Sequence, residues 1–338
     1  IVSGGITDDE LTRARTRAEV EYAHQIENYD SRADMIGMLA TFFDRTNYFE
    51  TLPSNYLALG LWLESDRMGF FLPALTQEKL DIQREVVKEE RRQRYDNVPY
   101  GTAFERLLHL AYEPDYSYHW PTIGSMEDLA AASLDDIREF FATWYRPDNA
   151  TLTLVGDFIP AEAKKLIEKY FGDIEPGRNF PRFNMQRKAL VSERRETFPS
   201  IVQLPRIYQL YHLPKMGERD WVAADMLTTI LATDKASRLD RALVHEQQIA
   251  QDVAAYVLPT EATGMLMMHA TAKEGIDIAK VERAMDDEIA RIVSGGITDD
   301  ELTRARTRAE VEYAHQIENY DSRADMIGML ATFVGDPQ

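Results

Sequence analysis

The stretch FDRTNYFETLPSNYLALGLWLESDRM, residues 43–68, decides the fold of the first half of the chain. Residues 46–51 alternate with a period of two, which predicts a strand. Pro53 then suits the first turn of a helix, where its missing N–H leaves no bond unmade. The turns of this helix are marked by Leu57, Leu61, Glu64 and Met68. A strand that leads into a helix indicates a mixed α and β fold.

Helical patterns dominate the rest of the first half. LTQEKLDIQREVVKEERRQRY, residues 75–95, predicts a long helix, and residues 126–145 predict two short ones. ATLTLVGD, residues 150–157, alternates as a strand and closes with Gly156-Asp157. The first half is therefore expected to combine strands with covering helices.

A linker and a second set of elements follow. Residues 175–200 contain three prolines and little periodicity, so we place a linker at 181–200. The elements predicted beyond it are strand 205–213, helices 222–232 and 237–247, strands 249–258 and 263–273, and helix 276–293. This order is not strictly alternating, which favours an α+β fold with antiparallel sheet covered by helices. A fainter similarity aligns residues 75–90 with 297–312, matching Leu80 to Leu302 and Glu90 to Glu312, and suggests two related domains.

The two ends of the chain share one sequence. Residues 1–42, IVSGGITDDELTRARTRAEVEYAHQIENYDSRADMIGMLATF, recur without a change at 292–333. Identical copies at the two ends indicate rearrangement, fusion or permutation of a parent gene rather than a solenoid of diverged repeats. Thr7 and Glu10 form a capping signature that predicts a long helix to about Phe42.

The duplication also predicts an assembly. Two identical helices compete for one docking place in the second domain, so one copy could dock in a neighbouring chain and form a swapped homo-oligomer. The alternative is that the N-terminal copy fills the place of a missing helix in the first domain.

Composition excludes several classes of partner. Acidic residues outnumber basic ones 57 to 38, and the formal charge of −19 repels phosphate backbones and anionic lipids. We expect neither nucleic acid nor a membrane surface as a partner. The absence of cysteine excludes disulfides, thiolate metal sites and a cysteine nucleophile. No apolar run approaches the roughly 20 residues of a membrane span, and the first residues lack a signal-peptide core, although a cleaved signal could have preceded them.

Four ordered blocks resemble the M16 family of zinc peptidases, the pitrilysin and insulinase group. They are residues 43–68, QREVVKEERRQRYDNVPYG at 83–101, PTIGSMEDL at 121–129 and WYRPDNATLTLVGDF at 144–158. The resemblance runs from about Asp44 to the C-terminus. It implies two related domains, each a mainly antiparallel sheet covered by helices. The first, residues 43–180, is expected to be incomplete, and the second is expected at 201–338.

The resemblance implies a zinc site that this sequence does not complete. In the family, two histidines of an H-x-x-E-H helix bind zinc, and the glutamate between them acts as general base. Glu90, with Glu89 beside it, stands at the position of the third ligand. H-x-x-E-H occurs nowhere in the sequence, and its nearest imitation, His24 and Glu27, has Asn28 in place of the second histidine. Zinc is therefore expected to be absent or weakly bound, and the histidines are expected to serve mainly structural roles.

The resemblance also places substrate contacts. Asn47, Tyr48 and Phe49 lie on the strand whose edge pairs with extended peptides in the family. Val244 and Gln251 stand where the second domain often has an arginine and a tyrosine that hold the substrate backbone.

Three functions remain open at this stage. The first is a zinc metalloendopeptidase by descent with an incomplete metal site and impaired proteolysis on peptide or unfolded protein substrates. The second is a non-catalytic peptide-binding module or the partner subunit of an M16 pair. The third is a metal-independent adventitious hydrolase. We expect a soluble protein, with the bacterial periplasm slightly favoured by the resemblance.

Overall fold

The computed structural model describes residues 44–177 and 187–335. The chain divides into two compact units, and the described part of the first comprises residues 44–93 and 122–177. That of the second comprises residues 94–121 and 187–335. The helix predicted for the first copy of the duplicated segment lies outside the described residues.

The first unit is helical wherever it has regular structure. Its α-helices are α3 (Leu57–Ala74), α4 (Gln77–Arg91), α6 (Met126–Ala131), α7 (Leu134–Trp144) and α8 (Pro160–Phe171), with short 3₁₀ turns η1 (Ser54–Tyr56) and η4 (Pro147–Asn149). A π-helical turn, η2 (Arg92–Asp96), follows α4, and its residues from Arg94 onward belong to the second unit. The predicted helix after Pro53 is confirmed as η1 and α3, and α3 packs against α7 and α8. Side-chain caps start three of these helices: Thr76 begins α4, Ser125 begins α6, and a Ser133–Asp136 capping box begins α7.

The two strands predicted for the first unit are not formed. Residues 46–51 and 150–157 have no regular secondary structure in the described chain. An alternating pattern sets which face each side chain takes, but a strand also needs a partner for its backbone N–H and C=O groups. Within the described residues of the first unit, no segment forms a ladder of backbone hydrogen bonds with either stretch.

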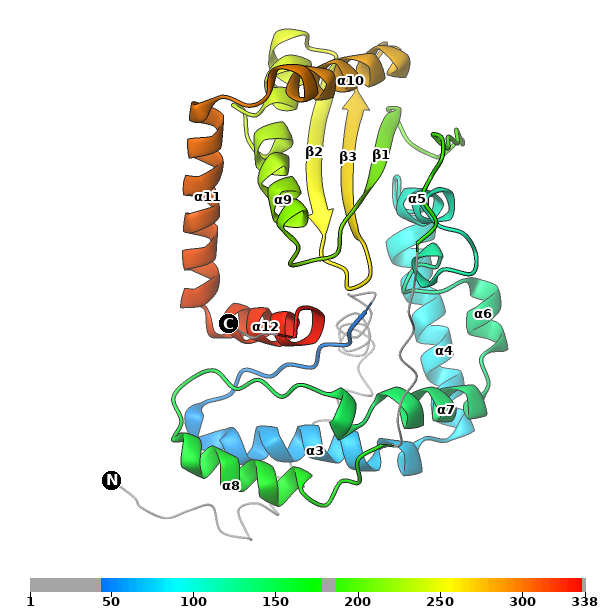
Figure 1. Ribbon diagram of the computed structural model, residues 1–338. Coiled ribbons are helices and arrows are strands. Elements are labelled where there is room, and N and C mark those ends of the chain that lie inside the picture. The colour runs from blue at the N-terminus through cyan, green and yellow to red at the C-terminus, as the bar shows by residue number, and fades with distance from the viewer. Residues whose placement is uncertain (1–43, 178–186, 336–338) are drawn as a thin grey trace. The chain divides into compact units, whose positions relative to one another are not determined.

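The second unit contains a three-stranded antiparallel sheet with the strand order β1-β3-β2 (Figure 1). Its strands are β1 (Arg206–Leu213), β2 (Ala250–Leu258) and β3 (Gly264–Ala272), close to the predicted bounds. Arg206 pairs with Thr271 across β1 and β3, and Asp252 pairs with the same residue from β2. The predicted α+β fold is therefore confirmed.

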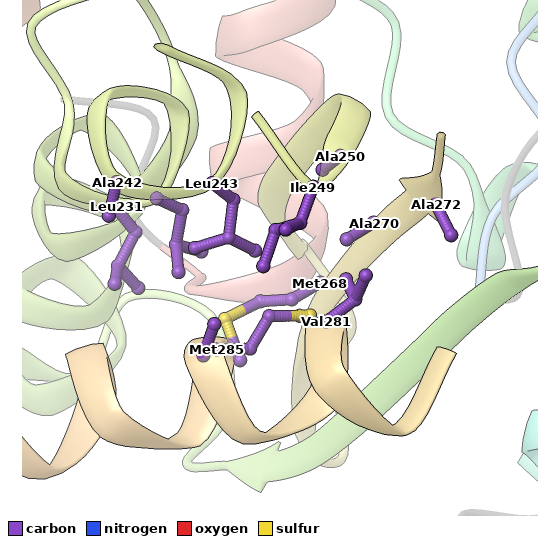
Figure 2. Close-up of a cluster of buried hydrophobic side chains, with 12 residues drawn as sticks. Leu231, Ala242, Leu243, Ile249, Ala250, Met268, Ala270, Ala272, Val281 and Met285 are labelled. Carbon is purple, nitrogen blue, oxygen red and sulfur yellow. The ribbon is translucent and has the colours of Figure 1, made fainter. Parts of the chain in front are cut away.

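The helices of the second unit pack on the sheet and on one another. They are α5 (Ala103–Ala111), η3 (Ser117–His119), α9 (Arg219–Ala232), η5 (Asp240–Glu246), α10 (Ile278–Gly295), α11 (Asp299–Glu318) and α12 (Tyr320–Phe333). The core under α10 is shown in Figure 2 and contains Leu243, Met268, Val281 and Met285, all at most 1% exposed. Val281 and Met285 are four residues apart, so they lie on one face of α10 and meet the even-numbered side chains of β3.

The second copy of the duplicated segment forms two helices rather than one long helix. The predicted cap is confirmed here: Thr298 and Glu301 form a capping box at the start of α11. The predicted continuity is wrong, because the helix breaks at Asn319. The side-chain oxygen of Asn319 accepts hydrogen bonds from the backbone N–H groups of Asp321 and Ser322 and begins α12. Asparagine favours such a cap because its short side chain competes for backbone donors.

None of the helices in the described part of the chain combines the length and the apolar character that crossing a membrane requires.

Candidate functional site

The predicted peptide-contacting segment is extended and partly open to solvent. Asn47 and Tyr48 are half-buried, whereas Phe49 is 52% exposed. Residues 45–53 follow one another without helix or turn. This segment thus presents an exposed apolar side chain from a stretch that forms no strand in the described chain.

Tyr48 is held from two sides by residues that sequence reasoning did not find. Its ring meets the ring of Tyr145 edge-to-face at 6.1 Å, and the Arg67 guanidinium lies 4.3 Å from its centre. The hydroxyls of Thr46 and Tyr145 are 2.7 Å apart. Burial is the main cause that raises the pKa of Tyr48 far above its ordinary value, and the neighbouring Tyr145 adds to the rise. Tyr48 therefore stays neutral and anchors the extended segment to α3 and the end of α7.

A pair of carboxyl groups adjoins this anchor. Glu50 lies on the extended segment, and Glu64 lies on α3 with an oxygen 3.2 Å from Arg67. Loss of solvation raises the pKa of Glu50 to about 7, and the negative charge of Glu64 adds to the rise. Loss of solvation also raises the pKa of Glu64, against the opposing effect of Arg67. The pair therefore favours a shared proton at neutral pH.

Replacing Glu50 by Gln should make the first unit less sensitive to alkaline pH. The folded-state pKa of Glu50 lies above its unfolded value, so its favourable contribution is complete below pH 4.5 and is lost as the pH rises to about 7. We expect Glu50→Gln to unfold like wild type at pH 4.5 and to be more stable at pH 8. The gain is about 1 kcal/mol after allowance for solvent screening, because the Glu50 side chain is only partly removed from water.

Thermal unfolding of both proteins from pH 4 to 9 measures this difference. Glu78→Gln, at an exposed position in the first turn of α4, is the matched control. A constant difference between Glu50→Gln and wild type at every pH would contradict the shared proton.

Glu90, the predicted metal-ligand position, is buried on α4. Its side chain is 5% exposed, whereas Glu89 is exposed and accepts hydrogen bonds from Arg92 and Gln93. Arg84 and Arg91 donate to the carbonyl oxygens of Ala132 and Gly124, both at 2.6 Å, and so fix the rotation of α4. It is therefore Glu90, rather than Glu89, that turns inward.

The described donors do not fit a zinc ion. Among residues 44–177 and 187–335, no group of three or more His, Asp and Glu side chains is placed to hold a metal. His24 and Glu27 lie outside the described residues. In the second copy of the same peptide, His315 and Glu318 form a 3.8 Å ion pair with both side chains 76% exposed. Such a solvated pair, without a third donor, does not hold zinc at a structural or catalytic site.

The two predicted residues of the second unit differ in their surroundings. Val244 packs against the hydrophobic core, so its side chain serves stability. Gln251 is exposed and lies where the register between β2 and β3 shifts. Such a bulge re-aims a side chain relative to its neighbours on the strand. Gln251 therefore remains open for a hydrogen bond to a ligand, whereas Val244 does not.

His109, His119 and His212 lie in packed surroundings of the kind that a structural role requires. His109 and His119 stack at 4.4 Å, and His119 Nδ1 lies 2.8 Å from the carbonyl oxygen of Tyr112. Burial lowers the pKa of His109, and burial together with the nearby Arg187 lowers that of His212 to about 4. All three rings pack against aromatic neighbours, and the lowered pKa values of His109 and His212 favour their neutral forms at neutral pH.

Fold and site together define an α+β scaffold with a buried glutamate on α4 and no assembled metal site in its described part. A family model described as "Peptidase M16 inactive domain" matches residues 131–309, more than half of the 338 residues. The chain therefore belongs to the M16 peptidase family, which confirms the resemblance drawn from its sequence blocks.

Individual relatives are similar over most of this chain. "Zinc protease PqqE" of Helicobacter pylori is 27% identical over 304 residues, which are 87% of this chain and 66% of the relative. The crystal structure of a protease from Helicobacter pylori gives a TM-score of 0.74 at 25% identity and covers 82% of this chain and 68% of that one. The first half of the periplasmic protease PqqL of Escherichia coli gives a TM-score of 0.63 at 17% identity, covering 86% of this chain and 63% of that one. The chain spans two thirds or less of the length of the curated relatives that it matches most strongly.

Proposed function

We propose that this chain is a zinc metalloendopeptidase by descent whose metal site is incomplete within its own 338 residues, so that its proteolysis is impaired. The observation that supports the proposal is the set of possible zinc ligands in this chain. Glu90 is buried at the third-ligand position, but the sequence contains no H-x-x-E-H to provide two histidines and a general base. A single carboxylate does not bind zinc tightly or replace that base.

The substrate class follows from the extended segment of the first unit. Exposed Phe49 and the anchored Tyr48 present a backbone of the kind that pairs with extended peptides. Gln251 in the second unit can add a side-chain hydrogen bond. These features favour peptides or unfolded proteins as ligands, and the charge of −19 disfavours nucleic acid and anionic membranes.

A non-catalytic peptide-binding or partner subunit is the alternative that the same features favour. In that case the extended segment of this chain binds peptide, and a partner that carries H-x-x-E-H supplies the zinc chemistry. Periplasmic placement is part of the same proposal and is supported by the similarity to periplasmic PqqL. A metal-independent hydrolase is the third candidate, which a chelator distinguishes because its activity would survive.

Cleavage of an unfolded protein substrate with and without a chelator tests the primary proposal. We expect the purified chain to show little cleavage, and we expect Glu90→Gln to change it no further, because one ligand position alone performs no chemistry. Glu89→Gln, the exposed neighbour, is the control. Strong cleavage that is abolished by the chelator and by Glu90→Gln would overturn the proposal. Cleavage that resists chelation would instead support the metal-independent hydrolase.

A further inference from the structure

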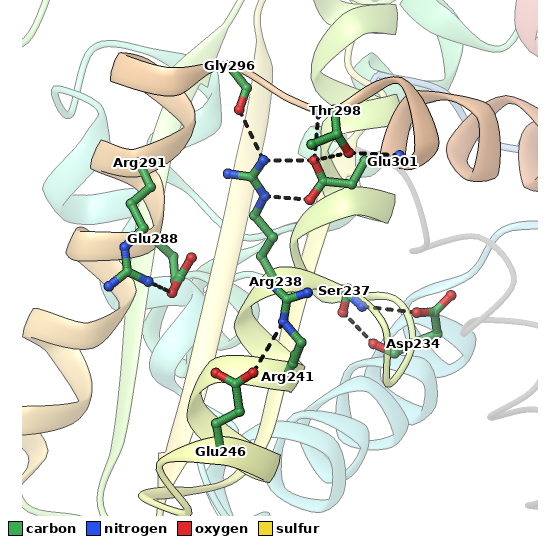
Figure 3. A network of polar contacts seen from close by, with 10 residues as sticks. All are labelled: Asp234, Ser237, Arg238, Arg241, Glu246, Glu288, Arg291, Gly296, Thr298 and Glu301. Atoms are coloured by element: carbon green, nitrogen blue, oxygen red, sulfur yellow. Dashed lines mark hydrogen bonds and ion pairs between the residues drawn. The ribbon is translucent and has the colours of Figure 1, made fainter.

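The second copy of the duplicated segment is fastened to its unit at the beginning of α11. Arg238 donates to both carboxylate oxygens of Glu301, at 2.6 and 2.7 Å, and to the carbonyl oxygen of Gly296 at 3.0 Å (Figure 3). Asp234 lies 3.9 Å from Arg308, one to two turns further along α11. We call residues 234–238 and the C-terminal end of α9 the α11 docking site.

Open space follows α11 from Glu301 to Asn319. A groove of about 850 Å³ lies between α11 and the α11 docking site, lined by Ile230 and Asp234 on one side and by Thr307 and Val311 on the other. Most side chains of α11 are exposed, and Ala305 is its one buried residue. The polar contacts of α11 with the docking site involve Glu301 and Arg308, so few polar contacts must break for this helix to leave.

Residues 1–42 carry every group that the α11 docking site uses. Gly296, Thr298, Glu301, Ala305 and Arg308 correspond to Gly5, Thr7, Glu10, Ala14 and Arg17. Since the two sequences are identical, the intrinsic affinities of the two copies for the site are equal. Each chain thus has two copies of the ligand for the one α11 docking site that its described residues form.

The second copy has the advantage of a short tether. It follows α10 through Gly295 and Gly296, and such a tether gives an effective concentration on the order of millimolar. A first copy from another molecule is present only at the bulk protein concentration. It therefore replaces the second copy when the contacts of the second copy are weakened or when the protein is concentrated.

We propose that the α11 docking site binds residues 1–42 of a second copy of this chain, in exchange for its own residues 297–333. Identity of sequence supplies the complementarity, and Arg238 is the shared anchor. The exchange is independent of the proposed peptidase-related function, since it uses none of the residues assigned to zinc or peptide.

Light scattering on the full chain tests the exchange through Glu301→Gln. This change removes the charge that Arg238 meets in the second copy and leaves Glu10 of the first copy intact, so it shifts the competition by about 100-fold. A 100-fold shift lowers the millimolar advantage of the tether to about 10 μM. We therefore expect Glu301→Gln to form dimers above about 10 μM, whereas wild type, Glu10→Gln and the double variant remain mainly monomers in that range. A Glu301→Gln protein that stays monomeric, or a dimer that persists in the double variant, would overturn the proposal.

Cross-linking provides a second readout that does not require Glu301 to be changed. The chain has no cysteine, so Arg17→Cys with Asp234→Cys introduces two unique thiols for a short bismaleimide. We expect a product of twice the chain mass whose yield rises with protein concentration, and Arg308→Cys with Asp234→Cys should link within one chain. If Arg17→Cys links only within its own chain or does not link at all, the docked segment does not come from another molecule, and the proposal is wrong.

Discussion

Replacing Arg238 by Ala is expected to lower the free energy of unfolding of the second unit by about 3–5 kcal/mol. The side chains of Arg238 and Glu301 are only 12% and 11% exposed, and their bond is bidentate. Removal of the guanidinium leaves a carboxylate without its partner in a poorly solvated place, which costs more than a surface pair does. Because both copies of the duplicated segment would use Arg238, neither copy can compensate for its loss.

Arg241→Ala is the matched control for this prediction. Arg241 lies three residues away and pairs with Glu246 at 3.6 Å, with side chains 57% and 65% exposed (Figure 3). Such an exposed pair contributes about 1 kcal/mol or less. Chemical denaturation of the two variants should therefore separate them clearly, and equal losses would show that the Arg238–Glu301 pair does not anchor α11.

The Arg238 effect should also depend on pH. Hydrogen bonds from Arg238 hold the pKa of Glu301 at about 2, below the ordinary value of 4.5. The contribution of the pair is therefore present above pH 4.5 and is lost as the pH falls toward 2. The difference in stability between wild type and Arg238→Ala should shrink over that range.

A substitution in the hydrophobic core is expected to lower the free energy of unfolding by a similar amount. Leu243→Ala is expected to cost about 2–5 kcal/mol, because the side chain is fully buried and its removal leaves a cavity. Leu243 packs with Met268 of β3 and Met285 of α10, so the cavity would open between the sheet and its covering helix (Figure 2). Two flexible methionines can relax into part of that space, which places the expected loss near the middle of the range.

Val293→Ala tests whether the loss reflects burial. Val293 lies on α10 in the same unit and is 82% exposed. We expect it to change stability by about 0.5 kcal/mol or less. Urea denaturation measured by circular dichroism gives both values, and a Leu243→Ala protein as stable as Val293→Ala would contradict the packing of the core described here.

Local signals in the sequence predicted most elements of the second unit. The capping signature of the duplicated segment appears as the Thr298–Glu301 capping box, and the three strands lie close to their predicted bounds. These features depend on neighbouring residues, which a sequence displays directly. The break at Asn319 was missed, although asparagine followed by Asp321 is a recognisable start of a helix.

Long-range partners could not be predicted in the same way. The strands expected at 46–51 and 150–157 failed because alternation does not say which segment will complete the ladder. The contact between Thr46 and Tyr145 joins residues 99 positions apart, and no local sequence pattern predicts it. The bulge at Gln251 likewise depends on how β2 meets β3.

The candidate site depended on the resemblance more than on the residues alone. Within the run of charged residues 88–92, a glutamate is most simply a surface residue, and only the family position singled out Glu90. Its burial on α4 agrees with that position. The Glu50–Glu64 pair was missed, although Glu64 and Arg67 are three residues apart on a predicted helix, a spacing that signals an ion pair.

Elemental analysis of the purified 338-residue chain for zinc tests the central claim most directly. The account predicts far less than one zinc per chain after dialysis against metal-free buffer, with the same content in Glu90→Gln, because the described residues do not assemble a zinc site. Close to one zinc per chain in wild type, lost in Glu90→Gln, would show that other residues complete the site around Glu90 and would contradict the account.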